Sequence, residues 1–451
     1  MKQLSFTLKF YLFSGIFFFF YFSNIVSQDF FYVHLYHFLS IILLFFVYNR
    51  LTFKFEGFSL SNLLLNVSII SLIWIIADNI ISYHYRGNFW VFNEADSIEY
   101  DKAASALLKS NLSFVEVLRS VGLGNLDFSD YGMIVYTYLN YVIIESNLMV
   151  NFSFWVIGIL NAKLMYEIGL FSMDRRNAFF CALLFTTSTF MGWFNSSGLK
   201  ESFMIFLVVL AFRNYYYYLY KGKLLKNVLF ILIPIFLLFF FRPIVSIFFL
   251  FSIFATYVLN SSASLFRRTS IVIIGLIFVF GFNFIIVQEF NRYTGGSFDN
   301  MIEGLYAEEM VVGGNLFFNY AVQIISAVFG VFPSINPEFR LLLSFFYPSL
   351  LLKILLGFFF IHGTYRAIKK KHIIMLPIVI FCYTEIVALA TTLEVLELRK
   401  NMPHFMMYYF IMFFSISTLD DESIKNRKLI SSFNWYYSLI AFALILYWNS
   451  R

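Results

Sequence analysis

The feature that most constrains this chain is a series of apolar blocks, each about 18–20 residues long, which recur from one end to the other. A helix needs about 20 apolar residues to cross the roughly 30 Å hydrocarbon layer of a bilayer. Unbroken apolar runs without period-2 alternation indicate helices and not barrel strands. Hydrophobic residues make up 60% of the 451 and charged residues 13%, about half the charged share of a soluble domain. The sequence therefore predicts an all-α, polytopic transmembrane bundle, with a single transmembrane domain over 1–451.

Hydropathy predicts about thirteen membrane spans. They are separated by short polar connections, except at two places where the connection is long. The predicted spans are 8–27, 30–48, 61–82, 152–171, 177–195, 201–219, 227–241, 244–260, 270–288, 344–364, 373–393, 404–420 and 431–448.

Basic residues fix the predicted orientation, because short cytoplasmic loops carry an excess of Lys and Arg. More than half of the 32 Lys and Arg residues lie in connections that a cytoplasmic N-terminus places inside. The net charge of +6 therefore reflects topology and attraction to membrane lipid, and it gives no argument for nucleic acid. The inside groups are Lys2 and Lys9; Arg50 and Lys54; Arg175 and Arg176; Lys221, Lys223 and Lys226; Arg267 and Arg268; Arg366 and Lys369 to Lys371; Lys425, Arg427 and Lys428.

Two long segments, 83–151 and 289–343, fall on the opposite, outer face in this topology. Within the first, 131–147 is apolar enough to resemble a span. Counting it as one would invert every later loop and move the basic groups to the wrong side. We therefore expect 131–147, and likewise 316–332, to form interfacial or re-entrant helices in the two outer loops.

Charged residues next to membrane spans are costly and mark candidate sites. Here they gather at four turns on the predicted outer face. Cations facing carboxylates at a membrane boundary suit an anionic, phosphate-bearing substrate, since Arg and Lys are the usual phosphate ligands. The residues are Asp96, Glu99 and Asp101 after the third span, Lys200 and Glu201, Arg242 before Pro243, and Arg399 with Lys400.

Each of these residues also has an ordinary structural interpretation. Asp96 could cap a helix that begins near Ser97, Lys200 and Glu201 could be a solvated helix-start pair, and Arg242 could extend to the interface. Arg399 and Lys400 could merely set topology. The functional interpretation depends on all four turns placing such groups on one side.

The sequence indicates no cofactor. The six histidines are scattered, and Cys181 and Cys382 each lie inside an apolar run, so no metal motif is present. A divalent cation at Asp96 and Glu99 is left open. No phosphate-binding GxxxxGK[ST] loop occurs, which argues against ATP-driven work.

The order of the polar motifs resembles that of bacterial GT-C-type membrane glycosyltransferases and the related O-antigen (surface polysaccharide) polymerases. The resemblance covers about residues 61–410. One departure is that Ala95 follows Glu94 where the family often has a glycine or second acid, which leaves open whether Glu94 or Asp96 acts. The matching elements are DSIEYDKAA (Asp96, Tyr100, Ala104), GILNAKLMYEIGLFSMDRR, GLKES (Lys200, Glu201), FRP (Arg242, Pro243) and LRKNMP (Arg399, Pro403).

The resemblance implies transfer from a polyprenyl (pyro)phosphate-linked sugar on the outer side of a bacterial inner (plasma) membrane. Such a reaction needs a carboxylate to accept the proton of the incoming hydroxyl and cations to hold the departing phosphate. We expect Asp96 as base, with Glu94 or Glu99 in reserve, and Tyr100 and Glu201 in support. The phosphate ligands would be Lys200, Arg242, Arg399 and Lys400.

Three functions compete at this stage. The first is a polymerase of O-antigen or capsule repeat units, which would work with polyprenyl-linked sugars and with a chain-length regulator or other polysaccharide-assembly proteins. The second is a GT-C transferase that adds one sugar from a polyprenyl-phosphate donor. The third is a flippase or transporter of lipid-linked oligosaccharide, which predicts charges in mid-span positions and pseudo-symmetric halves.

The base assignment makes a direct prediction. Replacing Asp96 by Asn keeps the size of the side chain but removes the proton acceptor, so glycosyl transfer should be abolished while the amount of protein in the membrane stays the same. Transfer is measured with membranes that contain equal amounts of each protein. Undiminished transfer by Asp96→Asn would exclude Asp96 as the base.

Overall fold

A computed structural model describes residues 2–23, 26, 30–54, 57–87, 96–123, 130–221, 225–260, 328, 335, 337–391, 398–419 and 422–450. The described part is all α-helix, with no strand, as the sequence predicts. The helices are α1 (Lys2–Phe22), α2 (Phe31–Lys54), α3 (Leu60–Arg86), α4 (Asp96–Lys109), α5 (Phe114–Leu123), α6 (Tyr131–Ile143), α7 (Asn147–Gly169), α8 (Arg175–Thr186), α9 (Thr189–Ser197), α10 (Glu201–Lys221), α11 (Leu225–Leu238), α12 (Pro243–Asn260), α17 (Pro337–Leu355), α18 (Gly357–Lys369), α19 (Met375–Thr391), α20 (Leu398–Thr418) and α21 (Ile424–Asn449).

Six of the described helices, α1, α2, α3, α7, α10 and α21, are long and apolar enough to cross a membrane, and up to eight spans result if two bent pairs count as one span each. The pairs are α8 with α9, bent by 48°, and α17 with α18, bent by 49°. Described helices occupy most of the length of twelve of the thirteen predicted spans, with a bent pair of helices at 177–195 and another at 344–364, which confirms helical structure there. The remaining segment, 270–288, lies outside the described residues, and the full count of spans stays a prediction.

The middle of the chain forms the core. Every residue from 177 to 199 is buried, which covers nearly all of α8 and the whole of α9, and α20 is buried along most of its length. α3, α7 and α20 all pack against α8. A helix that is apolar all round is stable only where other helices or lipid surround it. The exposed apolar side chains lie instead on peripheral helices such as α1, α3, α11 and α21.

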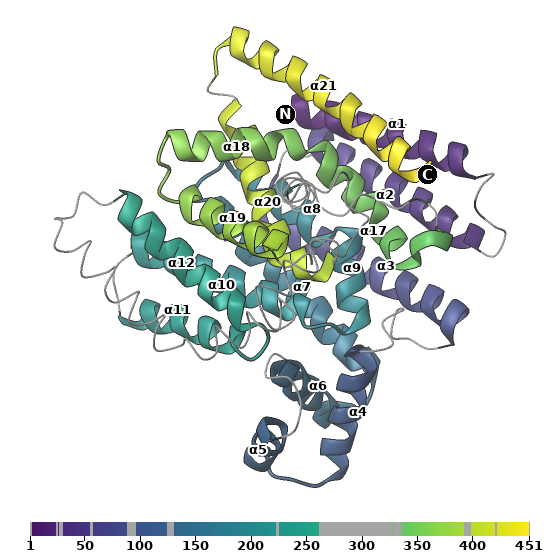
Figure 1. Ribbon diagram of the computed structural model, residues 1–451, viewed down its shortest axis with the longest axis vertical. Coiled ribbons are helices and arrows are strands. Elements are labelled where there is room, and N and C mark those ends of the chain that lie inside the picture. The colour runs from purple at the N-terminus through teal and green to yellow at the C-terminus, as the bar shows by residue number, and fades with distance from the viewer. Residues whose placement is uncertain are drawn as a thin grey trace.

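The first and last helices pack together at the edge of the bundle (Figure 1). Phe442 of α21 contacts Phe10, Phe17 and Phe18 of α1, with ring centroids 4.9–6.1 Å apart. Aromatic pairs in this range stabilise by about 0.5–1.5 kcal/mol beyond their area. These phenylalanines therefore join two helices from opposite ends of the sequence.

α4, α5 and α6 form a unit that projects from one end of the bundle (Figure 1). α4 packs along α6, and the Tyr141 hydroxyl donates a hydrogen bond to Asp101. α6 thus confirms the predicted helix within 131–147. The predicted companion at 316–332 lies outside the described residues except for Val328.

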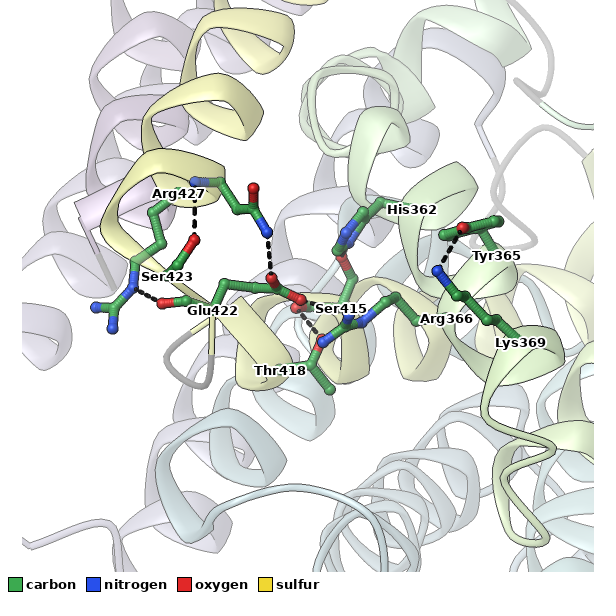
Figure 2. A network of polar contacts seen from close by, with 10 residues as sticks. His362, Tyr365, Arg366, Lys369, Ser415, Thr418, Glu422, Ser423 and Arg427 are labelled. Carbon is green, nitrogen blue, oxygen red and sulfur yellow. Dashed lines mark hydrogen bonds and ion pairs between the residues drawn. The ribbon is translucent and has the colours of Figure 1, made fainter.

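Several basic connections meet at another end of the bundle, here called the basic end. Arg366 on α18 pairs with Glu422 just before α21, His362 Nδ1 lies 2.8 Å from Ser415 Oγ, and Arg427 Nε donates to the Glu422 carbonyl (Figure 2). Ser417 Oγ donates to Asp174 at 3.0 Å, which brings the turn before Arg175 to the same place. These contacts join loops that the basic residues assign to one side of the membrane.

Labelling of introduced cysteines tests whether the basic end and the projecting unit of α4, α5 and α6 lie on opposite sides of the membrane. Both native cysteines are buried. Lys109 on α4 has a 73% exposed side chain and Lys370 is exposed at the basic end. A membrane-impermeant maleimide applied to spheroplasts should label Lys109→Cys at once and Lys370→Cys only after the membrane is opened. Labelling of both variants from the same side would contradict the predicted orientation.

Candidate functional site

Four helices begin at one place, and the residues at those starts carry most of the predicted site. Asp96 opens α4, Asp130 precedes α6, Glu201 opens α10, and Arg242 precedes Pro243 at the start of α12. Helix N-termini present unpaired backbone N–H groups and positive dipole ends, so their convergence favours an anion. We call Asp96, Tyr100, Asp130, Lys200, Glu201 and Arg242 the charged cluster.

The turn between α9 and α10 positions Lys200. Gly198 caps the C-terminal end of α9, with a φ of 66° in the left-handed region that glycine adopts without strain. The chain then passes through Lys200 and enters α10 at Glu201. The sequence Gly-Leu-Lys-Glu therefore produces a break between two buried helices and places a cation and an acid side by side in it.

Lys200 is paired with a residue that the sequence interpretation missed. Its Nζ lies 2.6 Å from Asp130 Oδ1, and the Tyr100 hydroxyl donates to the same oxygen at 2.8 Å. The Lys200 side chain is only 10% exposed. Burial and the neighbouring Asp130 carboxylate raise the pKa of Tyr100 well above its usual range, so the phenol stays a donor. Asp130 thus orders both side chains.

Arg242 is buried against Glu201. Arg242 Nη2 lies 3.5 Å from Glu201 Oε1, with side chains 8% and 1% exposed. The other carboxylate oxygen, Glu201 Oε2, is buried and has no hydrogen-bond partner in the described part of the chain. A buried carboxylate oxygen without a partner is costly. Glu201 is therefore placed to accept a hydrogen bond from a bound molecule.

The two cations lie close enough to repel each other. Burial, and then the nearby Arg242 charge, lower the pKa of Lys200 below its usual value, although Asp130 and Glu201 act in the opposite direction. An added anion would reduce the repulsion between Lys200 and Arg242. The arrangement is therefore suited to binding phosphate.

The start of α4 is attached to the same turn. Ser97 Oγ donates a hydrogen bond to the Ser197 carbonyl, one residue before Gly198. Asp96 is half-buried and lies within electrostatic reach of Tyr100, whereas Glu99 is exposed. The structure thus brings the predicted Asp96, Tyr100, Lys200, Glu201 and Arg242 together and leaves Glu99 at the surface.

Some predicted residues cannot be placed. Glu94 lies outside the described residues, and α20 includes Arg399 and Lys400 but their side chains are not described. Their roles stay predictions. Among the described residues, no three His, Cys, Asp or Glu side chains are grouped to hold a metal ion.

Two buried acids within the helices were not among the predicted site residues. Asp78 on α3 accepts hydrogen bonds from Tyr36 (2.8 Å) and Ser196 (3.1 Å), and it thereby holds the end of α9 that leads to Lys200. Glu385 on α19 lies 3.9 Å from His404 and within electrostatic reach of Arg242. The available signal for Asp78 was a single carboxylate inside an apolar block.

Comparison with known proteins gives a fold likeness only. No family model and no curated protein matches the chain. The solved structures it resembles include an oligosaccharyltransferase, AglB, from Archaeoglobus fulgidus in complex with an inhibitory peptide and a dolichol-phosphate (TM-score 0.48, 12% identity, covering 86% of this chain and 55% of that one). The apo form of the A. fulgidus oligosaccharyltransferase is similar (TM-score 0.48, 13% identity, 87% and 55%). The chain spans about half the length of these proteins, and the likeness fixes neither a family nor a reaction for it.

The lowered pKa of Lys200 predicts an alkaline limit to anion binding. Lys200 loses its charge as the pH rises through this lowered pKa, so affinity for a lipid phosphate should fall at a lower pH than an ordinary lysine, with its pKa of about 10.4, would allow. In Lys200→Arg the charge persists, and the fall should disappear. Binding of a fluorescent lipid phosphate is measured between pH 7 and 10.5. Lys109→Arg, at an exposed lysine, should keep the original profile, and identical profiles for Lys200→Arg and the unmodified protein would contradict the assignment.

Proposed function

We propose that this protein is a membrane glycosyltransferase that acts on polyprenyl (pyro)phosphate-linked glycans during surface polysaccharide assembly. The observation that carries the proposal is the charged cluster, in which two buried cations and several carboxylates meet where four helices begin. The membrane-spanning character of the helices supports a substrate delivered by a lipid. The predicted orientation would put the cluster on the outer face of the membrane, which we propose is a bacterial inner membrane.

The proposed reaction is a displacement at the anomeric carbon of the lipid-linked sugar. A hydroxyl oxygen of the acceptor forms the new bond to that carbon, and the bond from the carbon to the phosphate oxygen breaks. The electron pair leaves with the phosphate, and the hydroxyl proton passes to a carboxylate. Lys200 and Arg242 bind the phosphate and stabilise the charge that develops on it.

The carboxylates divide into three roles. Asp130 is already engaged by Lys200 and Tyr100, so we assign it to positioning the cation. Asp96 keeps the role of base, with Glu94 and Glu99 in reserve, because it is half-buried at the edge of the cluster. Glu201, with one oxygen lacking a partner in the described structure, would accept a hydrogen bond from a substrate hydroxyl.

Within this class we favour a polymerase that joins O-antigen or capsule repeat units, because the size, the aromatic-rich composition and the predicted span count resemble such enzymes. The acidic element at Asp96 instead resembles transferases that add a single sugar. Arg399 and Lys400 would extend the phosphate site, and a chain-length regulator or other assembly proteins would be partners. A resident divalent cation is not part of the proposal.

A specific observation favours a second candidate, a flippase for lipid-linked oligosaccharide. Asp78, Lys353 and Glu385 are buried within helices, which is the pattern expected of a transport pathway. Lys353 Nζ lies 3.9 Å from the ring centroid of Phe405 and 4.3 Å from that of Tyr408. These rings hold the ammonium group inside the bundle, an arrangement that also suits a structural role.

The experiment that separates these functions is deletion of the gene followed by electrophoresis of the surface polysaccharide. We expect loss of the long-chain ladder with a single repeat unit retained. A truncated unit would indicate a single-sugar transferase, and loss of all surface glycan with lipid-linked intermediates trapped inside would indicate a flippase. An unchanged ladder would contradict the proposal.

Complementation tests the cluster itself. Arg242→Gln removes one of the two phosphate ligands and should fail to restore the ladder. Arg213→Gln is the matched control, because it breaks another Arg–Glu ion pair, in which Arg213 lies 2.8 Å from Glu167. Arg213 is on α10, the helix that Glu201 opens, but it lies outside the charged cluster. It should restore the ladder. Restoration by Arg242→Gln would contradict the phosphate role.

A further inference from the structure

A large apolar cavity opens beside the charged cluster, between α5, α6, α10 and α11. Its volume is about 710 Å³, within the roughly 300–1,000 Å³ that binding pockets occupy. Its walls are apolar and mostly aromatic. They include Phe114 on α5, Tyr131 and Val135 on α6, Phe203 on α10, Phe236 on α11 and Phe241 just before Arg242.

Three of the residues that line the cavity are next to, or close in sequence to, residues of the charged cluster. Tyr131 follows Asp130, Phe241 precedes Arg242, and Phe203 lies two residues after Glu201. One end of the apolar cavity is therefore adjacent to the groups that would bind phosphate. This pairing of an apolar volume with buried cations complements an amphiphile that has an anionic head and a hydrocarbon tail.

Gly132 closes the wall at that end. Its N–H donates to the Phe240 carbonyl at 2.8 Å. A Cβ at position 132 would lie 2.6 Å from the Phe241 ring and 2.8 Å from the Phe240 carbonyl oxygen. The close approach holds α6 against the turn that carries Arg242, so the cavity and the cluster have a fixed relation.

The other side of the cavity faces the surface. Leu139 is 45% exposed and Phe236 is 63% exposed, and α11 continues this apolar surface through Ile233. We expect these exposed apolar side chains to face the hydrocarbon or its boundary with the headgroups. A lipid tail could therefore enter sideways from the bilayer while its phosphate approaches Lys200 and Arg242.

We propose that this cavity binds the phosphate-proximal part of the hydrocarbon tail of the lipid phosphate that the enzyme uses. The inference rests on the proposed function, since the phosphate is the one held by the charged cluster. We commit to a single-chain lipid phosphate, because the proposed function acts on polyprenyl-linked substrates, which carry one tail. Two-tailed phospholipid from the bulk membrane is the occupant that the test must exclude.

The main test measures binding of two lipid phosphates, one with a long polyprenyl tail and one with a short, water-soluble tail, to protein in nanodiscs. Val135→Trp fills the cavity, and Ile143→Trp is the matched control, on an exposed residue of the same helix that does not line it. Each methylene excluded from an apolar site costs about fourfold in affinity. We expect Val135→Trp to weaken long-tail binding at least tenfold and short-tail binding less than twofold, with no change for Ile143→Trp.

Equal weakening for both tails, no weakening at all, or an equal effect of Ile143→Trp would overturn the inference.

Photo-crosslinking of the unmodified protein keeps the test decisive if Val135→Trp fails to fold. A long-tail lipid phosphate with a diazirine near its phosphate end should label α6 and α11, and unlabelled lipid phosphate should compete. Labelling by a diazirine phospholipid that lipid phosphate does not displace would overturn the inference.

The two proposals fail separately, because binding is measured without transfer. If long-tail binding depends on Val135 but no sugar is transferred, the proposed function is wrong and the tail site stands. If sugar is transferred but Val135→Trp does not distinguish tail lengths, the tail site is wrong and the proposed function stands.

Discussion

An ammonium group that is almost fully removed from water needs a compensating charge, and at Lys200 that charge comes from Asp130. Removing one partner of a buried ion pair typically costs about 3–5 kcal/mol, since the other charge is left without compensation. The two residues are 70 positions apart and their charged atoms are 2.6 Å apart. This contact links the projecting unit of α4, α5 and α6 to the central helices, and the geometry of the proposed site depends on it.

The rest of the molecule supports that contact from both sides. Asp78 and Ser97 hold the end of α9, through Ser196 and the Ser197 carbonyl. Gly132 holds α6 against the turn before Arg242. Interactions at the basic end, such as Arg366 with Glu422, tie together loops outside the charged cluster. The bundle thus separates a set of anchored basic loops from a cluster in which two buried cations are each paired with a carboxylate.

The sequence predicted the helices well, because a span must be apolar over a fixed length and because Lys and Arg lie in the loops between spans. It also predicted that Lys200, Glu201 and Arg242 would meet, since each follows or precedes a span on the same predicted side. Asp130 was not predicted as a site residue, because its role depends on an ion pair with a residue 70 positions away, which no local sequence pattern encodes. The break between α8 and α9 was also not predicted, because the two helices are equally apolar. The local feature at the break is Ser188, which caps the start of α9.

The central claim is that Lys200 and Arg242 bind the phosphate of a lipid-linked sugar. An experimental structure of the protein in nanodiscs with a lipid pyrophosphate sugar tests it most directly. The account predicts phosphate oxygens within about 3 Å of Lys200 Nζ and the Arg242 guanidinium. Phosphate density at the basic end, beside Arg175 or Arg366, with an unchanged charged cluster would contradict it.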